Sequence, residues 1–100
     1  MIIEVALPFH LRRLAGLEKE VVPVEVSGTA TPATVLTALE ERYPMLRGTI
    51  REHGTCARRA YMRYFADGRD ISHESPDQPL PEAVINGREP FIVIGAISGG

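Results

Sequence analysis

Hydrophobic and β-branched residues gather in four short runs along the chain, and each run predicts a β-strand. In residues 2–7 the apolar side chains alternate between the two faces of an extended chain. Residues 20–26 are rich in valine, and Pro23 indicates that this second strand lies at a sheet edge. Residues 61–66 are rich in aromatic side chains, and the apolar residues 91–94 form the last predicted strand.

Turn and loop residues separate these strands. Residues 11–16 are interpreted as a loop or a short turn after the first strand. An Asp-Gly pair at residues 67–68 predicts a hairpin turn, after which residues 69–71 begin a short return strand. Residues 72–81 carry three prolines and predict a loop, with one helical turn at its end. An Asn-Gly pair at residues 86–87 marks the last turn.

The strongest helical signal begins at Thr31, which is a suitable N-cap, and Pro32 suits the first helical position. Pro44 disfavours a helical conformation at the residue before it, so we expect the helix to end near Tyr43. Residues 45–50 predict a further helical turn. The apolar residues that share one face of the helix are Val35, Leu36, Leu39 and Tyr43.

The predicted order of elements is strand, strand, helix, strand, short strand, strand. A mixed sheet of four or five strands with one principal helix packed across it is a two-layer α+β fold. The first and last strands are the most apolar, so we expect them side by side at the centre of the sheet. That pair would be parallel, because the chain reaches the last strand through a helical crossover.

Composition limits the class of protein. One hundred residues with 44% hydrophobic residues fit a single domain. The single cysteine, Cys56, excludes an internal disulfide and favours a reducing compartment. We see no signal peptide and no apolar run of membrane-spanning length. The net charge of −2 gives no general attraction to nucleic acid or to acidic lipid, and Lys19 is the only lysine.

Few residues in the chain suggest a catalytic or metal site of its own. His10, His53 and His73 are widely separated in the sequence, so we expect no metal site. The sequence has no phosphate-binding loop and no nucleophile elbow. The chain ends in Gly99 and Gly100 directly after the last predicted strand, and the terminal carboxylate of Gly100 is the group that we expect to react.

Three short motifs accompany this ending. Residues 11–16 read Leu-Arg-Arg-Leu-Ala-Gly, residues 39–44 read Leu-Glu-Glu-Arg-Tyr-Pro, and an Asn-Gly turn precedes the last strand. With the order of elements, they make the whole chain resemble the ubiquitin-like β-grasp sulfur carriers. These include the molybdopterin synthase small subunit, the thiamin sulfur carrier and carriers for cysteine synthesis. Residues 8–10, Pro-Phe-His, depart from the family, in which many members carry two aromatics followed by alanine.

The resemblance implies a cytoplasmic carrier and not an enzyme in itself. A ubiquitin-activating-type enzyme would adenylate Gly100 with ATP, and sulfur from a persulfide would replace AMP to leave a thiocarboxylate. A downstream sulfur-acceptor enzyme would then use that sulfur. The carrier itself would bind no cofactor. Residues 1–97 would form the β-grasp domain, and residues 98–100 a flexible diglycine tail, in which Gly99 helps the chain to enter a narrow channel.

We expect a docking surface for the partner near this tail. Arg12 and Arg13 are candidates for charged contacts at its rim, although a solvated loop is an equal alternative. The apolar and tail candidates are Phe9, Phe65, Phe91, Ile97 and Ser98. For Phe9, core packing and an interface remain open alternatives.

Two other functions remain open from the sequence. A ubiquitin-like modifier would use the same activated carboxylate to acylate a lysine of a target protein. A β-grasp interaction domain would carry out no acyl chemistry. If the chain is the small subunit of a molybdopterin synthase-type complex, the complex and not the chain is the enzyme. Neither nucleic acid nor a membrane is an expected partner.

Overall fold

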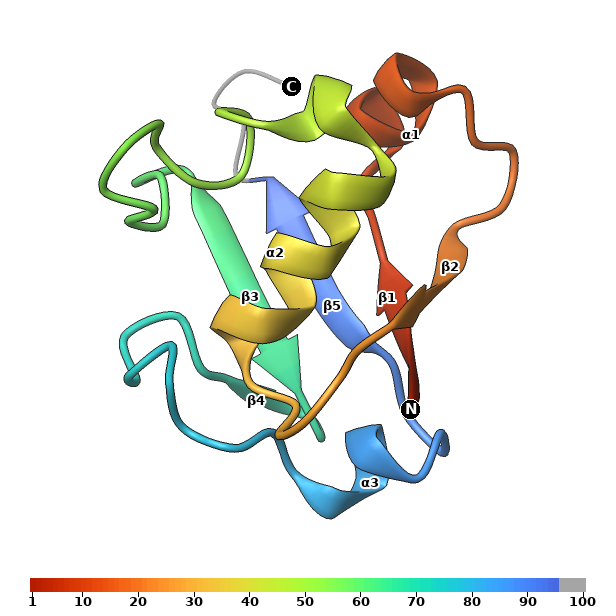
Figure 1. Cartoon of the computed structure of the whole chain (residues 1–100), viewed down its shortest axis with the longest axis vertical. Coiled ribbons are helices and arrows are strands. Elements are labelled where there is room, and N and C mark those ends of the chain that lie inside the picture. The colour runs from red at the N-terminus through yellow and green to blue at the C-terminus, as the bar shows by residue number, and fades with distance from the viewer. Residues whose placement is uncertain (96–100) are drawn as a thin grey trace.

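The strands of the chain form one mixed sheet that α2 crosses on one face (Figure 1). This computed structural model describes residues 1–95. The order of the five strands in the sheet is β2-β1-β5-β3-β4. They are β1 (Ile2–Ala6), β2 (Val21–Glu25), β3 (Met62–Ala66), β4 (Arg69–Asp70) and β5 (Phe91–Gly95).

The first and last strands are neighbours at the centre of the sheet, as predicted. β1 and β5 run parallel, with Ala6 opposite Ile92, whereas β5 and β3 run antiparallel. β2 pairs with β1 alone and is an edge strand. Pro23 therefore lies at an edge, as its missing backbone N–H predicts.

The principal helix, α2 (Pro32–Arg42), begins where the sequence places it. The Thr31 hydroxyl accepts a hydrogen bond from the backbone N–H of Thr34 at 3.1 Å, and the Thr34 hydroxyl accepts one from the Thr31 N–H at 2.8 Å. This capping box satisfies two N–H groups that have no partner inside the helix. The helix ends at Arg42, and a 3₁₀ turn, η1 (Pro44–Leu46), follows it.

The interpretation of residues 11–16 as a loop is wrong. They belong mostly to α1 (Phe9–Ala15), which ends at Gly16 in the left-handed conformation with φ of 71°. The N–H of Gly16 bonds to the carbonyl of Arg13, and the N–H of Leu17 bonds to that of Arg12. A seven-residue helix spans about two turns, so the sequence contains too few apolar repeats to reveal it.

The core lies between the sheet and α2, and a short helix, α3 (Glu82–Ile85), closes it at the far end through Val84. Among residues 1–95, no helix is both long and apolar enough to cross a membrane. Residues with no side-chain exposure include Ile3, Val5, Val35, Leu39, Leu46, Ile50, Met62, Val84 and Phe91.

Candidate functional site

The last strand ends at the same end of the sheet as β1. In the register of the sheet, Ala6 lies opposite Val21, and Met62 lies opposite Gly95. We call this end, marked by these four residues, the exit end. α1 and the segment 42–61 lie around it (Figure 1). The chain therefore leaves β5 among residues that come from distant parts of the sequence.

His10 packs directly against Gly95, the last described residue. A Cβ atom at Gly95 would lie 2.9 Å from His10 Cε1 and 3.6 Å from Met62 Sδ. A distance of 2.9 Å is shorter than van der Waals contact, so any side chain at residue 95 would displace the imidazole. The sequence gave no signal for this contact, and His10 was considered there only as a metal ligand, a role that was not expected.

Phe9 is the most exposed large hydrophobic residue among those described, with 62% of its surface open to solvent. The guanidinium carbons of Arg12 and Arg13 lie 5.5 Å and 5.8 Å from the centre of its ring. Arg12 is held in place because its Nε donates to the carbonyl of Leu7 at 3.2 Å. The structure thus brings together three of the predicted docking residues on α1, and it favours the surface alternative for Phe9.

The other two predicted aromatic residues lie elsewhere. Phe65 is half-buried in β3 and lies opposite Ile92, three residues before the end of β5. The structure corrects the expectation for Phe91, which has no exposed surface and packs against Tyr64 with ring centres 5.5 Å apart. Phe91 and Val93 point into the core on the same face of β5, so neither side chain is open to a partner.

Sequence reasoning missed Ile94, which is 43% exposed. It lies opposite Arg63, one residue before Gly95. The signal was available in the alternation of β5, because Ile94 is out of phase with the buried Phe91 and Val93. An exposed apolar residue therefore lies on the open face of the sheet, next to the exit end.

The remaining predicted site residues lie outside the described part of the chain. They are Ile97, Ser98, Gly99 and Gly100. The proposed boundary between a domain of residues 1–97 and a tail of residues 98–100 lies there as well.

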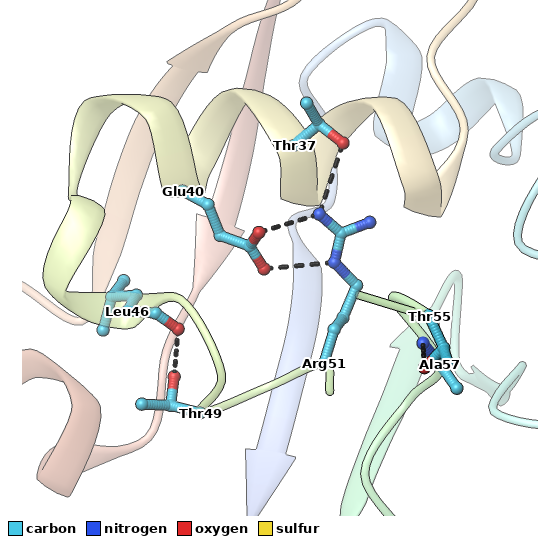
Figure 2. A network of polar contacts seen from close by, with 7 residues as sticks. All are labelled: Thr37, Glu40, Leu46, Thr49, Arg51, Thr55 and Ala57. Atoms are coloured by element: carbon cyan, nitrogen blue, oxygen red, sulfur yellow. Dashed lines mark hydrogen bonds and ion pairs between the residues drawn. The ribbon is translucent and has the colours of Figure 1, made fainter. Parts of the chain in front are cut away.

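The segment 42–61 beside the exit end is fixed to α2 by Arg51. Figure 2 shows its guanidinium facing the Glu40 carboxylate, with a third contact to Thr37. Within the same segment, the Thr49 hydroxyl donates to the carbonyl of Leu46 at 2.6 Å. These contacts give a long irregular segment a defined position relative to the sheet.

A hollow lined by Gly16, Leu17, Val21 and Tyr43 lies beside the exit end. Neither His10 nor Gly95 lines this hollow. Within residues 1–95, no three His, Cys, Asp or Glu side chains gather to hold a metal ion.

Comparisons with known proteins place the fold. No protein-family model matches the sequence, and no curated protein sequence is significantly similar to it. SAMP1 from Haloferax volcanii has a similar crystal structure, with a TM-score of 0.74 at 20% identity over 100% of both chains. The solution structure of the small archaeal modifier protein 1 from Methanosarcina acetivorans gives 0.69 at 24% identity, over 100% of this chain and 99% of that one.

A chain in the crystal structure of the Amycolatopsis orientalis BexX/CysO complex is also similar. Its TM-score is 0.71 at 16% identity, over 97% of this chain and 98% of that one. At these identities the similarity establishes the fold, which is the ubiquitin-like β-grasp fold that the resemblance predicted.

Proposed function

We propose that the chain is a sulfur carrier that works through the carboxylate of Gly100. The observation that supports this most is the position of β5. It is a central strand, it ends at the exit end, and the sequence runs from there to Gly99 and Gly100 in five residues. The carrier function rests on this arrangement, on the β-grasp fold and on the diglycine ending together.

The chemistry follows from the weakness of a carboxylate as an electrophile. An oxygen of the Gly100 carboxylate attacks the α-phosphorus of ATP, and pyrophosphate leaves. A persulfide sulfur of the partner then attacks the acyl carbon of the adenylate, and AMP leaves. A second thiol of the partner cleaves the resulting sulfur–sulfur bond, which leaves a thiocarboxylate on Gly100 and a disulfide on the partner.

The glycines suit this delivery for a steric reason. A residue without Cβ passes through a narrow channel and adopts backbone angles that are closed to other residues. All the catalytic groups in this scheme belong to the adenylating partner and to the downstream acceptor. The chain supplies the acyl group, and the acceptor's pathway would be molybdopterin, thiamin or cysteine synthesis.

A protein modifier is the second candidate function. Two of the similar structures are of proteins named small archaeal modifier proteins. A modifier would undergo the same adenylation, after which a lysine amine of a target would displace the activating group and form an amide. The two functions therefore differ only in the nucleophile that takes the acyl group.

Mass spectrometry of the protein from its native cells tests the proposal. A carrier shows a form in which one oxygen is replaced by sulfur, and fragmentation of the tryptic peptide that follows Arg88 locates the change at Gly100. Isopeptide-linked glycines on other proteins would instead establish the modifier. Finding neither form in cells that use the protein would contradict both.

The matched control is a semisynthetic protein in which Gly100 ends in an amide. It keeps every residue and the fold, but it has no carboxylate to adenylate. We expect it to restore no function to cells that lack the gene, while the same protein with a free carboxylate does. Restoration by the amide would support an interaction domain without acyl chemistry.

A further inference from the structure

The exit end is positively charged, although the net charge of the chain is negative. The segments 7–20 and 42–61 contain eight basic and three acidic residues, a formal balance of +5. The whole chain carries −2, so the remaining residues carry −7. These two segments join the strands at the exit end (Figure 1). Glu40, which pairs with Arg51, lies just outside them, and with it the balance at this end is still +4.

Most of this positive charge has no counter-ion among residues 1–95. Of the eight basic residues, Arg51 alone forms an ion pair with another residue of the described chain, through Glu40. Arg58 and Arg59 donate to backbone carbonyls, which orient the guanidinium groups without neutralising them. Arg13 and Arg47 are exposed. A cluster of this kind attracts negative charge on a partner.

Apolar groups lie among these charges. Phe9 is held under two guanidinium groups, and Leu14 on α1 is 51% exposed. Met45 in η1, which packs beside α1, is 46% exposed. Aromatic residues, methionine and arginine are the residue types enriched in protein–protein interfaces. The mixture therefore favours a folded protein partner over a nucleic acid, which would need few aliphatic contacts.

The reach of the chain end determines where the partner must sit. Five residues follow Gly95, and fully extended they span at most about 17 Å. The longest dimension of the protein is 34 Å. An active site that takes the carboxylate of Gly100 must therefore lie close to the exit end, and the partner's surface around that site must face the basic residues.

We propose that the adenylating partner carries an acidic rim around the entrance to its active site, and that this rim docks on the exit end through Arg13, Arg47 and Phe9. The inference rests on the proposed function, because it assumes that the chain end is delivered to such an enzyme. Attraction between the two charged surfaces would speed encounter and align the chain end with the entrance. Dissolved salt would weaken this attraction.

The test uses the ubiquitin-activating-type enzyme of the source organism, ATP and labelled pyrophosphate. The exchange of label into ATP reports adenylation of the full chain. The test variant is Arg13→Glu with Arg47→Glu, and the matched control is Arg69→Glu with Arg88→Glu. Both double variants change the net charge by the same amount at exposed residues, but at opposite ends of the protein.

We expect the test variant to lower kcat/KM at least about tenfold at low salt, and the control to change it little. The difference should shrink as salt is raised. Equal values for both variants would overturn the inference but leave the proposed function intact. A failure of the wild-type chain to support any exchange would instead contradict the proposed function.

A second copy of the chain or a nucleic acid could bind the exit end instead, and separate measurements distinguish these two cases. Sedimentation equilibrium detects a head-to-tail contact between the basic end of one copy and the acidic end of another. Fluorescence anisotropy with labelled single-stranded RNA detects a nucleic-acid site. The proposal would be overturned if the chain self-associates or binds RNA, if the test variant abolishes that binding while the control retains it, and if pyrophosphate exchange is unchanged in both variants. Monomers that bind no RNA support it.

Discussion

Arg51 binds both carboxylate oxygens of Glu40, its Nε donating to one at 3.1 Å and its Nη2 to the other at 2.9 Å. The two side chains are only 8% and 12% exposed. Burial alone would disfavour the charged form of Arg51, but the hydrogen bond and the charge of Glu40 outweigh it and raise its pKa above the ordinary value. This pair joins α2 to the segment 42–61.

Replacing one partner of this pair should destabilise the protein strongly. We expect Arg51→Met to lower the free energy of unfolding by about 3 kcal/mol, because Glu40 would keep a nearly buried charge without a counter-ion. Urea denaturation measures the change. The control is Arg69→Met, which breaks an exposed pair with Glu74 and should cost less than about 1 kcal/mol. Equal losses in the two variants would show that the burial of the first pair has no effect.

Tyr64 should make the protein sensitive to alkali. Burial raises the pKa of its hydroxyl to about 12, although the nearby positive charges of Arg51 and Arg58 oppose the shift. In the unfolded chain a tyrosine ionises near its ordinary value of about 10. The unfolded state therefore loses its proton first, so stability is constant below about pH 10 and falls as the pH rises toward 12.

The variant Tyr64→Phe should remove that alkaline loss. At neutral pH we expect it to change the free energy of unfolding by less than about 1 kcal/mol, since the hydroxyl has no hydrogen-bond partner in the described structure. Urea denaturation at neutral pH and near pH 11 measures both effects. Tyr61→Phe, at a residue 44% exposed, is the control and should keep the wild-type alkaline profile. The prediction fails if Tyr64→Phe also loses stability between neutral pH and pH 11 as the wild type does.

Gly48 and Gly54 form a matched pair for testing a close contact. Each has φ of 81°, so alanine at either position carries a similar backbone strain, about 1–2 kcal/mol. A Cβ at Gly48 would also clash with the imidazole of His53, whereas a Cβ at Gly54 would meet nothing within 4 Å. We expect Gly48→Ala to cost more than Gly54→Ala, and thermal denaturation measures both.

The excess should come from His53. In a protein that already carries His53→Ala, we expect Gly48→Ala and Gly54→Ala to cost the same. A persistent difference would mean that the surroundings of Gly48 other than the imidazole resist a side chain.

Phe9 should contribute to partner binding and little to folding. We expect Phe9→Ala to weaken binding to the adenylating partner by about 2 kcal/mol, the scale of an aromatic hot spot, because the ring is exposed and two guanidinium groups lie over it. Isothermal titration calorimetry measures it. Ile2→Ala, at a residue 48% exposed at the other end of β1, is the control. If Phe9→Ala and Ile2→Ala bind the partner with equal affinity, the contact does not involve Phe9.

The sequence predicted the parts of the fold that depend on repeated local signals. Thr31, Pro32 and the apolar stripe of α2 define one helix, and the apolar character of β1 and β5 places them together. α1 was missed because its seven residues span only about two turns, in which Leu11, Leu14 and Ala15 give a single i, i+3, i+4 repeat.

The site was predicted only in part for a related reason. Phe9 and Arg12, proposed as docking residues, lie together on α1. Phe91 was also proposed as a docking residue, although it is in phase with the core of β5. The contact between His10 and Gly95 and the basic character of the exit end join segments far apart in sequence. They depend on strand order, which no single segment reveals.

The parallel pairing of β1 with β5 has a mechanical consequence. Ile2 is the first residue of β1, and Gly95 is the last residue of β5. Because the two strands are parallel neighbours, tension between these residues pulls the strands past each other along their length. Their hydrogen bonds then resist in shear and must break together, rather than one after another as in a hairpin that unzips. An enzyme that pulls on the end of β5 would therefore load the hydrogen bonds between β1 and β5 in shear, the direction in which they resist force most.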